Sequence, residues 1–103
     1  MLTSHVSPTS CETTSNETID VIFNTLENEI LDRKELTLEF KNVLFISTYF
    51  LERLEKLIQR AKDLNVKVQI TNVQPAIYKV FQVARVKDIL AVCTGWIRHK
   101  EID

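Results

Sequence analysis

The sequence predicts a single α/β domain in which helices pack on a mostly parallel or mixed sheet of four to five strands. Residues 36–40 alternate between apolar and polar side chains, which indicates a strand with one buried face. Residues 51–64 then repeat apolar side chains at spacings of three, four and seven, as an amphipathic helix does. Strand-like and helix-like segments keep alternating along the chain, and this order favours parallel strands joined by right-handed crossovers.

The N-terminal part predicts one weak strand and one strong helix. Residues 1–6 suit a short edge strand, and residues 7–18 form a polar loop rich in Ser and Thr. The first helix is expected to begin at Ser15 or Asn16, because either side chain can accept from the unpaired N–H groups of an opening turn. Its apolar face consists of Ile19, Ile22, Phe23, Leu26, Ile30 and Leu31.

The central stretch predicts a buried strand, a turn with two hydroxyls and a long helix. After the strand at residues 36–40 and a turn at Lys41–Asn42, the run VLFI at residues 43–46 is apolar throughout and continues the buried strand region. The run ends at Ser47 and Thr48, which precede the second helix. The buried stripe of that helix consists of Leu51, Leu54, Leu57, Ile58, Ala61 and Leu64.

A third strand and a third helix follow. Asn65 stands where a left-handed residue commonly ends a helix, and residues 66–70 alternate as a strand does. Thr71 or Asn72 is expected to cap the third helix, and Pro75 is tolerated in its first turn. The buried side of this helix is expected to hold Ile77, Val80, Phe81 and Ala84.

The C-terminal part predicts a final strand and a tail. The apolar run ILAVC at residues 89–93 indicates a strand that ends at Thr94–Gly95. Tyr78 is expected at the boundary of the core, and Trp96 is expected to cover one of its edges. Residues 97–103 form a polar tail.

Composition argues against several classes of function. The formal net charge of −1 provides no basic field for nucleic acid. No apolar run approaches a membrane span, and the first ten residues do not resemble a signal peptide, so a cytoplasmic location without membrane insertion is expected. Gly95 is the single glycine, which excludes glycine-rich phosphate loops. We expect no metal, cofactor or disulfide from the scattered residues His5, His99, Cys11 and Cys93.

No set of residues predicts catalysis. The carboxylates Glu52, Glu55 and Asp63 alternate with Lys and Arg on the polar side of the second helix, so they indicate a solvated face rather than an acid–base pair. The protein is therefore not expected to be an enzyme. An active site built from the two ends of the chain is the lesser alternative.

Residues 36–90 resemble the STAS superfamily, the fold of anti-anti-sigma factors and related bacterial regulators. The resemblance rests on LTLEFKNVLFIST for the strand and turn, on FLERLEKLIQRAKDLNVKVQITNV for the helix and next strand, and on QPAIYKVFQVARVKDIL for the following helix. The string Ile46-Ser47-Thr48-Tyr49-Phe50 is closer to a poorly characterised STAS-like branch.

The resemblance implies a regulatory hydroxyl at the start of the second helix. Better-known members have an Asp-Ser-Ser/Thr-Gly turn there, whose hydroxyl is phosphorylated by a partner kinase with an ATPase-like fold. Thr48 falls on the phosphoacceptor and Ser47 on the preceding Asp, so both are candidate phosphoacceptors, whereas Tyr49 and Phe50 replace the small residues that follow. The alternative is that these hydroxyls only cap the helix. The candidate partner-binding residues are Ser47, Thr48, Tyr49, Phe50 and Glu52.

The function implied by the resemblance is regulatory and non-enzymatic. The first expectation is an anti-sigma factor antagonist that uses this turn to bind a kinase or anti-sigma factor with an ATPase-like fold, with or without a phosphorylation switch. The alternative is a structural accessory subunit that docks on the ATPase of a lipid-transporting ABC system. The sequence leaves a homodimer open in both cases.

Overall fold

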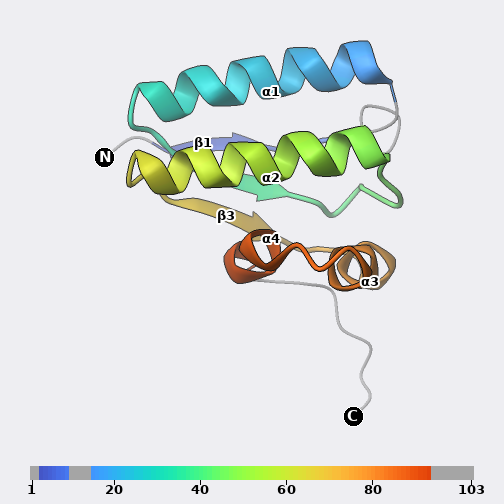
Figure 1. The fold of residues 1–103 in the computed structure, drawn as a ribbon. Coiled ribbons are helices and arrows are strands. Elements are labelled where there is room, and N and C mark those ends of the chain that lie inside the picture. The colour runs from blue at the N-terminus through green and yellow to red at the C-terminus, as the bar shows by residue number, and fades with distance from the viewer. Residues whose placement is uncertain (1–2, 10–14, 94–103) are drawn as a thin grey trace.

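The computed structural model describes residues 3–9 and 15–93 (Figure 1). The elements in chain order are β1 (Thr3–Val6), α1 (Asn16–Leu31), β2 (Glu35–Glu39), α2 (Thr48–Asp63), β3 (Val68–Thr71), α3 (Pro75–Val83) and α4 (Lys87–Val92). Some positions of the sequence predictions lie outside the described residues, namely residues 1–2, residues 10–14 with Cys11, Thr94–Gly95, Trp96, and the tail 97–103 with His99.

The described strands form one parallel sheet in the order β1-β2-β3. The register places Val6 beside Leu38 and Leu38 beside Ile70. Leu36 and Leu38 are buried, whereas Glu35, Thr37 and Glu39 are half-buried, which confirms the predicted alternation. A short β1 at the edge is also confirmed.

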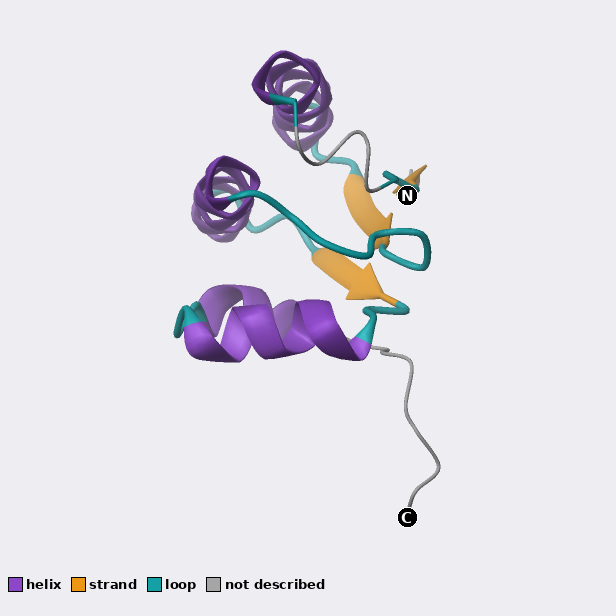
Figure 2. Ribbon diagram, turned by 90° about the vertical axis from the view of Figure 1, so that its right-hand side faces the viewer, coloured by secondary structure: helices purple, strands orange, loops and turns teal. Residues whose placement is uncertain are grey.

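Helices α1 and α2 lie side by side on the same face of this sheet. Figure 2 shows α1 and α2 end-on beside the strands, with α3 and α4 beyond β3. Two successive crossovers of the same hand place their helices on the same face when the strand order follows the sequence. No described helix covers the opposite face of the sheet, which carries the polar residues of β2.

The ends of the helices follow their local sequence. Ser15 caps α1 and accepts from the backbone N–H of Thr18 at 3.5 Å, as predicted. Asn65 has a φ of 57° after α2, which confirms the predicted left-handed residue. Arg33 and Arg85 take φ values of 62° and 57° after α1 and α3, a conformation that is uncommon outside Gly and Asn.

A chain of aromatic contacts runs through the core. The ring of Phe50 lies 5.1 Å from that of Phe23 and 6.0 Å from that of Phe40, and the rings of Phe40 and Phe81 lie 6.4 Å apart. These four residues belong to α2, α1, the end of the β2 segment and α3, and all four are buried. The aromatic contacts therefore link α1, α2 and α3 to the end of the β2 segment.

The predicted four to five strands are reduced to three among the described residues. The segment 43–46 is an irregular loop, in which Val43 is buried but Leu44 and Phe45 are 61% and 57% exposed. The chain leaves the sheet after Phe40, whose N–H bonds to the carbonyl of Thr71, and turns where Val43 N–H bonds to the carbonyl of Phe40. An apolar run after a turn was wrongly interpreted as a continuing strand.

The predicted final strand is helix α4 followed by a single parallel bridge between Cys93 and Ile70. Val86, Ile89, Leu90 and Cys93 are buried or half-buried at spacings of three, four and seven, which is a helical pattern that a short apolar run conceals. Lys62 of α2 donates to Asp88 Oδ1 at 3.0 Å, and this hydrogen bond lowers the pKa of Asp88. This ion pair links α4 to α2.

Pro75 lies in the first turn of α3, as predicted, but the cap residue differs from the predicted Thr71 or Asn72. The cap position is Gln74, which makes no side-chain cap bond and instead donates from Nε2 to the carbonyl of Lys41 at 2.7 Å. Thr71 belongs to β3, and Asn72 donates to Glu39 Oε2 at 2.9 Å, so neither caps the helix.

Three positions predicted as buried are exposed. Leu31, Val80 and Ala84 face solvent, because no element among the described residues packs over them. Tyr78 is half-buried, as predicted.

The aromatic chain predicts a large loss of stability on truncating its middle residue. Replacing Phe40 with Ala should lower the free energy of unfolding by about 3–5 kcal/mol, because the ring is fully buried between Phe50 and Phe81. The exposed Val21→Ala on α1 should change it by less than about 0.5 kcal/mol. Urea unfolding followed by circular dichroism measures both; equal effects would contradict the assigned core.

Candidate functional site

The turn before α2 is fixed by Ser47. This residue has extended backbone angles (φ −83°, ψ 163°), and its hydroxyl accepts from the backbone N–H of Phe50 at 3.1 Å. Its carbonyl accepts from the N–H of Leu51, also at 3.1 Å. Ser47 is therefore a helix cap in this structure, half-buried and already engaged through its side chain.

Thr48 differs from its neighbour because it is exposed. Its hydroxyl makes no hydrogen bond with the part of the chain that the structure describes, so the fold does not use it. The first turn of α2 contains no acidic side chain, which leaves the partial positive charge of the helix N-terminus without a local counter-charge. Thr48 thus presents a free hydroxyl at a positive helix end.

Tyr49 is held against α1 by a polar network. Its hydroxyl donates to Asp20 Oδ1 at 2.5 Å, and Arg53 Nη1 contacts the same oxygen at 2.5 Å. The Arg53 guanidinium also lies 5.5 Å from the centre of the Phe23 ring and 3.9 Å from Glu27. With only 16% of its side chain exposed, Arg53 fixes Tyr49 at the junction of the two helices.

The other two candidate partner-binding residues have different positions. Phe50 is only 2% exposed and packs in the core. It therefore anchors the turn to the core and is not available to contact a partner protein. This corrects the interpretation of Phe50 as a contact residue. Glu52 is exposed one turn after Thr48. Ser47, Thr48, Tyr49 and Glu52 therefore form a surface, called the α2 turn below, which Phe50 supports.

Sequence reasoning missed the apolar residues that precede this turn. Leu44 and Phe45 are exposed in the loop that leads to Ser47. The turn signal at Lys41–Asn42 could have indicated them, because residues between a turn and a helix cap commonly form a surface loop. These side chains extend the candidate surface with an apolar flank.

The described residues offer little for metal or nucleophilic chemistry. No group of three or more His, Cys, Asp or Glu side chains is placed to hold a metal ion in residues 3–9 and 15–93. His5 lies 3.7 Å from Glu39 on the sheet. Burial raises the pKa of the Cys93 thiol to about 11, so it stays protonated and weakly nucleophilic near neutral pH. Within the same residues no helix is long and apolar enough to cross a bilayer.

The two hydroxyls of the turn are expected to differ in their effect on stability. Ser47→Ala should cost about 1 kcal/mol, because it leaves the Phe50 N–H without its acceptor. Thr48→Ala should be within about 0.5 kcal/mol of the natural protein, since its hydroxyl has no such role. Thermal and urea unfolding of both variants checks this. Equal losses would mean that both hydroxyls are structural.

The Arg53 network is expected to stabilise the contact between α1 and α2. Arg53→Met should cost about 1.5–3 kcal/mol, because it removes the charged hydrogen bond to Asp20 while keeping an apolar stem. Lys56→Met, at an exposed position of the same helix, should cost less than about 0.5 kcal/mol. Urea unfolding of the two variants is the measurement, and similar values would contradict a specific network.

Comparison with known proteins identifies the fold family. A family model, described as the STAS domain, matches residues 12–101. A search of curated proteins found no match. The matched range contains α1 to α4 together with β2 and β3, and the α2 turn lies near its middle. The chain therefore belongs to the STAS domain family.

Proposed function

We propose that this STAS domain is a regulatory, non-enzymatic module that binds a partner protein through the α2 turn and is switched by phosphorylation of Thr48. STAS domains mediate protein–protein interaction, and this supports the general role. The observation that carries the proposal is the exposed Thr48 hydroxyl, which the fold leaves unused at a helix N-terminus. The proposed partner is a kinase or anti-sigma factor with an ATPase-like fold.

The switch acts through charge. In the proposed reaction the γ-phosphoryl group of ATP held by the partner passes to the Thr48 oxygen, ADP leaves, and the hydroxyl proton is released. The phosphate adds about −1.5 to −2 charges near pH 7. It is stabilised by the helix N-terminus, but it places this charge within one turn of exposed Glu52. A partner that fits the unmodified turn then meets a much more negative one.

Thr48 is a better acceptor than Ser47 for a geometric reason. The Ser47 oxygen already accepts the Phe50 N–H, and the side chain is half-buried. A kinase would have to compete with this bond and open the first turn of α2. No comparable contact holds the Thr48 hydroxyl in the described part of the chain.

The exposed apolar flank supports the second candidate function, docking on the ATPase of a lipid-transporting ABC system. Leu44 and Phe45 are large and exposed beside the turn. An apolar contact suits a permanent subunit interface, because such interfaces are more hydrophobic than transient ones. Under this alternative the partner is held continuously and Thr48 is not modified.

The switch predicts different behaviour for two substitutions of the same residue. With a partner captured from the native cell and then purified, Thr48→Ala should bind within about threefold of the natural protein, and Thr48→Asp should bind at least about tenfold more weakly. Thr25→Asp, an exposed threonine on α1, is the control for an added charge and should bind normally. Isothermal titration calorimetry gives the affinities.

Two further results separate the alternatives. Mass spectrometry of the protein from the native cell should find phosphate on Thr48. Equal binding by Thr48→Ala and Thr48→Asp would remove the switch. Equal binding together with a large loss in Phe45→Asp would favour the permanent ATPase subunit.

A further inference from the structure

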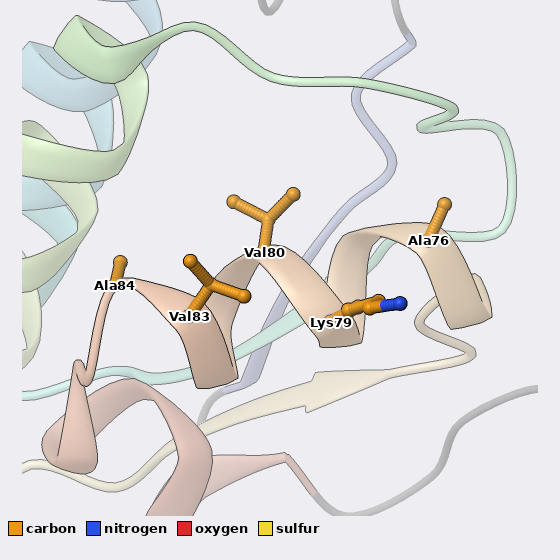
Figure 3. A pocket seen from close by; sticks show the side chains of 5 residues that line it. All are labelled: Ala76, Lys79, Val80, Val83 and Ala84. Carbon is orange, nitrogen blue, oxygen red and sulfur yellow. The ribbon is translucent and has the colours of Figure 1, made fainter.

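Helix α3 carries an apolar stripe on its outer side. Ala76, Val80, Val83 and Ala84 stand at spacings of four, three and one, so they align along one face of the helix. Val80 is 39% exposed and Val83 is 74% exposed. Figure 3 shows the stripe with Lys79 beside it, and these five residues line a hollow of about 380 Å³.

The inner side of the same helix is also apolar. Ile77 and Phe81 are buried in the core, and Phe81 contacts Phe40. The interior contacts of α3 are therefore provided by other residues, and the fold does not need the outer stripe. Surface helices normally carry polar residues on their outer side, so an apolar one indicates a contact surface.

Positive charges next to the stripe form its rim. Lys79 lines the hollow, and Arg85 and Lys87 follow within three residues of Ala84 in the sequence. All three are exposed, and none forms an ion pair with the described residues. No Asp or Glu occurs between Val73 and Lys87, although the whole chain has a net charge of −1. The next carboxylate, Asp88, is already paired with Lys62. The stripe thus lacks an internal counter-charge.

These positive charges indicate which kind of protein could bind to the stripe. In a two-fold dimer through this face, residue i of one copy meets the same region of the other, so cations would face cations. A partner with carboxylates beside an apolar face would instead satisfy both the stripe and its rim. From Ala76 to Ala84 the stripe extends about 12 Å along the helix, and the alanines at its ends permit the close approach of another helix.

We propose that the outer face of α3 is a second docking site, which binds an amphipathic helix with an apolar face and acidic edges from another protein. The helix lies along Val80 and Val83, and its carboxylates pair with Lys79, Arg85 and Lys87. The site does not depend on the α2 turn or on phosphorylation of Thr48. The proposal consequently stands or falls separately from the function proposed above.

Binding of a synthetic peptide to the full chain tests the site. The probe is a fluorescently labelled helical peptide of about 15 residues with Leu and Ala on one face and Glu along both edges. Saturable binding below about 1 mM is expected, with affinity that falls as salt is added. Val83→Glu should weaken it at least about tenfold and Lys79→Glu about three- to tenfold. Fluorescence anisotropy measures each affinity.

Matched controls define the outcomes that would overturn the proposal. Val21→Glu, at an exposed apolar position on α1, should leave the affinity unchanged. Circular dichroism should show all variants folded, and sedimentation should show a monomer. Equal binding of a peptide with Lys in place of Glu would overturn the proposed acidic partner. A dimer that Val83→Glu dissociates would assign the face to a second copy.

One further variant addresses the chain's own C-terminal residues, which follow Cys93 beyond the described range. If the acidic peptide binds only after Trp96→Ala, these residues occupy the face and the proposal fails. Unchanged binding by Trp96→Ala and by Thr48→Asp supports an independent site for another protein.

Discussion

The burial of Phe50 is the interaction on which the rest of the structure depends. Its ring contacts Phe23 of α1 and Phe40 at the end of the β2 segment, while its backbone N–H bonds to the Ser47 hydroxyl. One residue thereby fixes the position of α2 on the sheet and the start of its first turn. Thr48 lies two residues before Phe50, and with Phe50 anchored in the core the Thr48 side chain is exposed. The geometry of the α2 turn is thus a result of core packing.

The domain places structural side chains and exposed candidate contact residues close together in the sequence. At the start of α2, the Ser47 side chain caps the helix and Phe50 packs in the core. Thr48 and Glu52 of the same turns face solvent. In α3, Phe81 serves the core and Val80 beside it faces outward. This arrangement suits a small interaction domain, because substitutions at its contact surfaces need not disturb the core.

The sequence predicted the elements whose pattern is local. The alternation over Leu36 to Phe40, the stripe of α2 and the Ser47 cap all depend on residues within a few positions of one another. Residues 43–46 and 89–93 were misassigned, because a short apolar run does not reveal whether the chain still lies in the sheet. The exposed apolar side of α3 also escaped prediction, since periodicity cannot show that no element among the described residues covers it.

The contacts around the candidate site could be predicted only in part. The cap and the exposed hydroxyl follow from their place before a helix, but the network of Tyr49, Arg53 and Asp20 joins residues 29 and 33 positions apart. The sequence around each of these residues predicts an ordinary surface or boundary position. Their association depends on how α1 and α2 pack, which no local pattern encodes.

The left-handed residues that follow α1, α2, α3 and β3 have a consequence for the stability of the connections. Arg33, Asn65, Asn72 and Arg85 adopt positive φ without being glycine, and the one glycine of the chain is at position 95. A side chain at positive φ strains the folded turn, because the left-handed region is unfavourable for residues that carry a Cβ, although the same side chain leaves the unfolded chain less backbone freedom to lose than glycine would. The surrounding packing therefore holds these four connections in conformations that their own sequence does not favour, and glycine at Arg33 or Arg85 would relieve the strain at the cost of a more flexible unfolded chain.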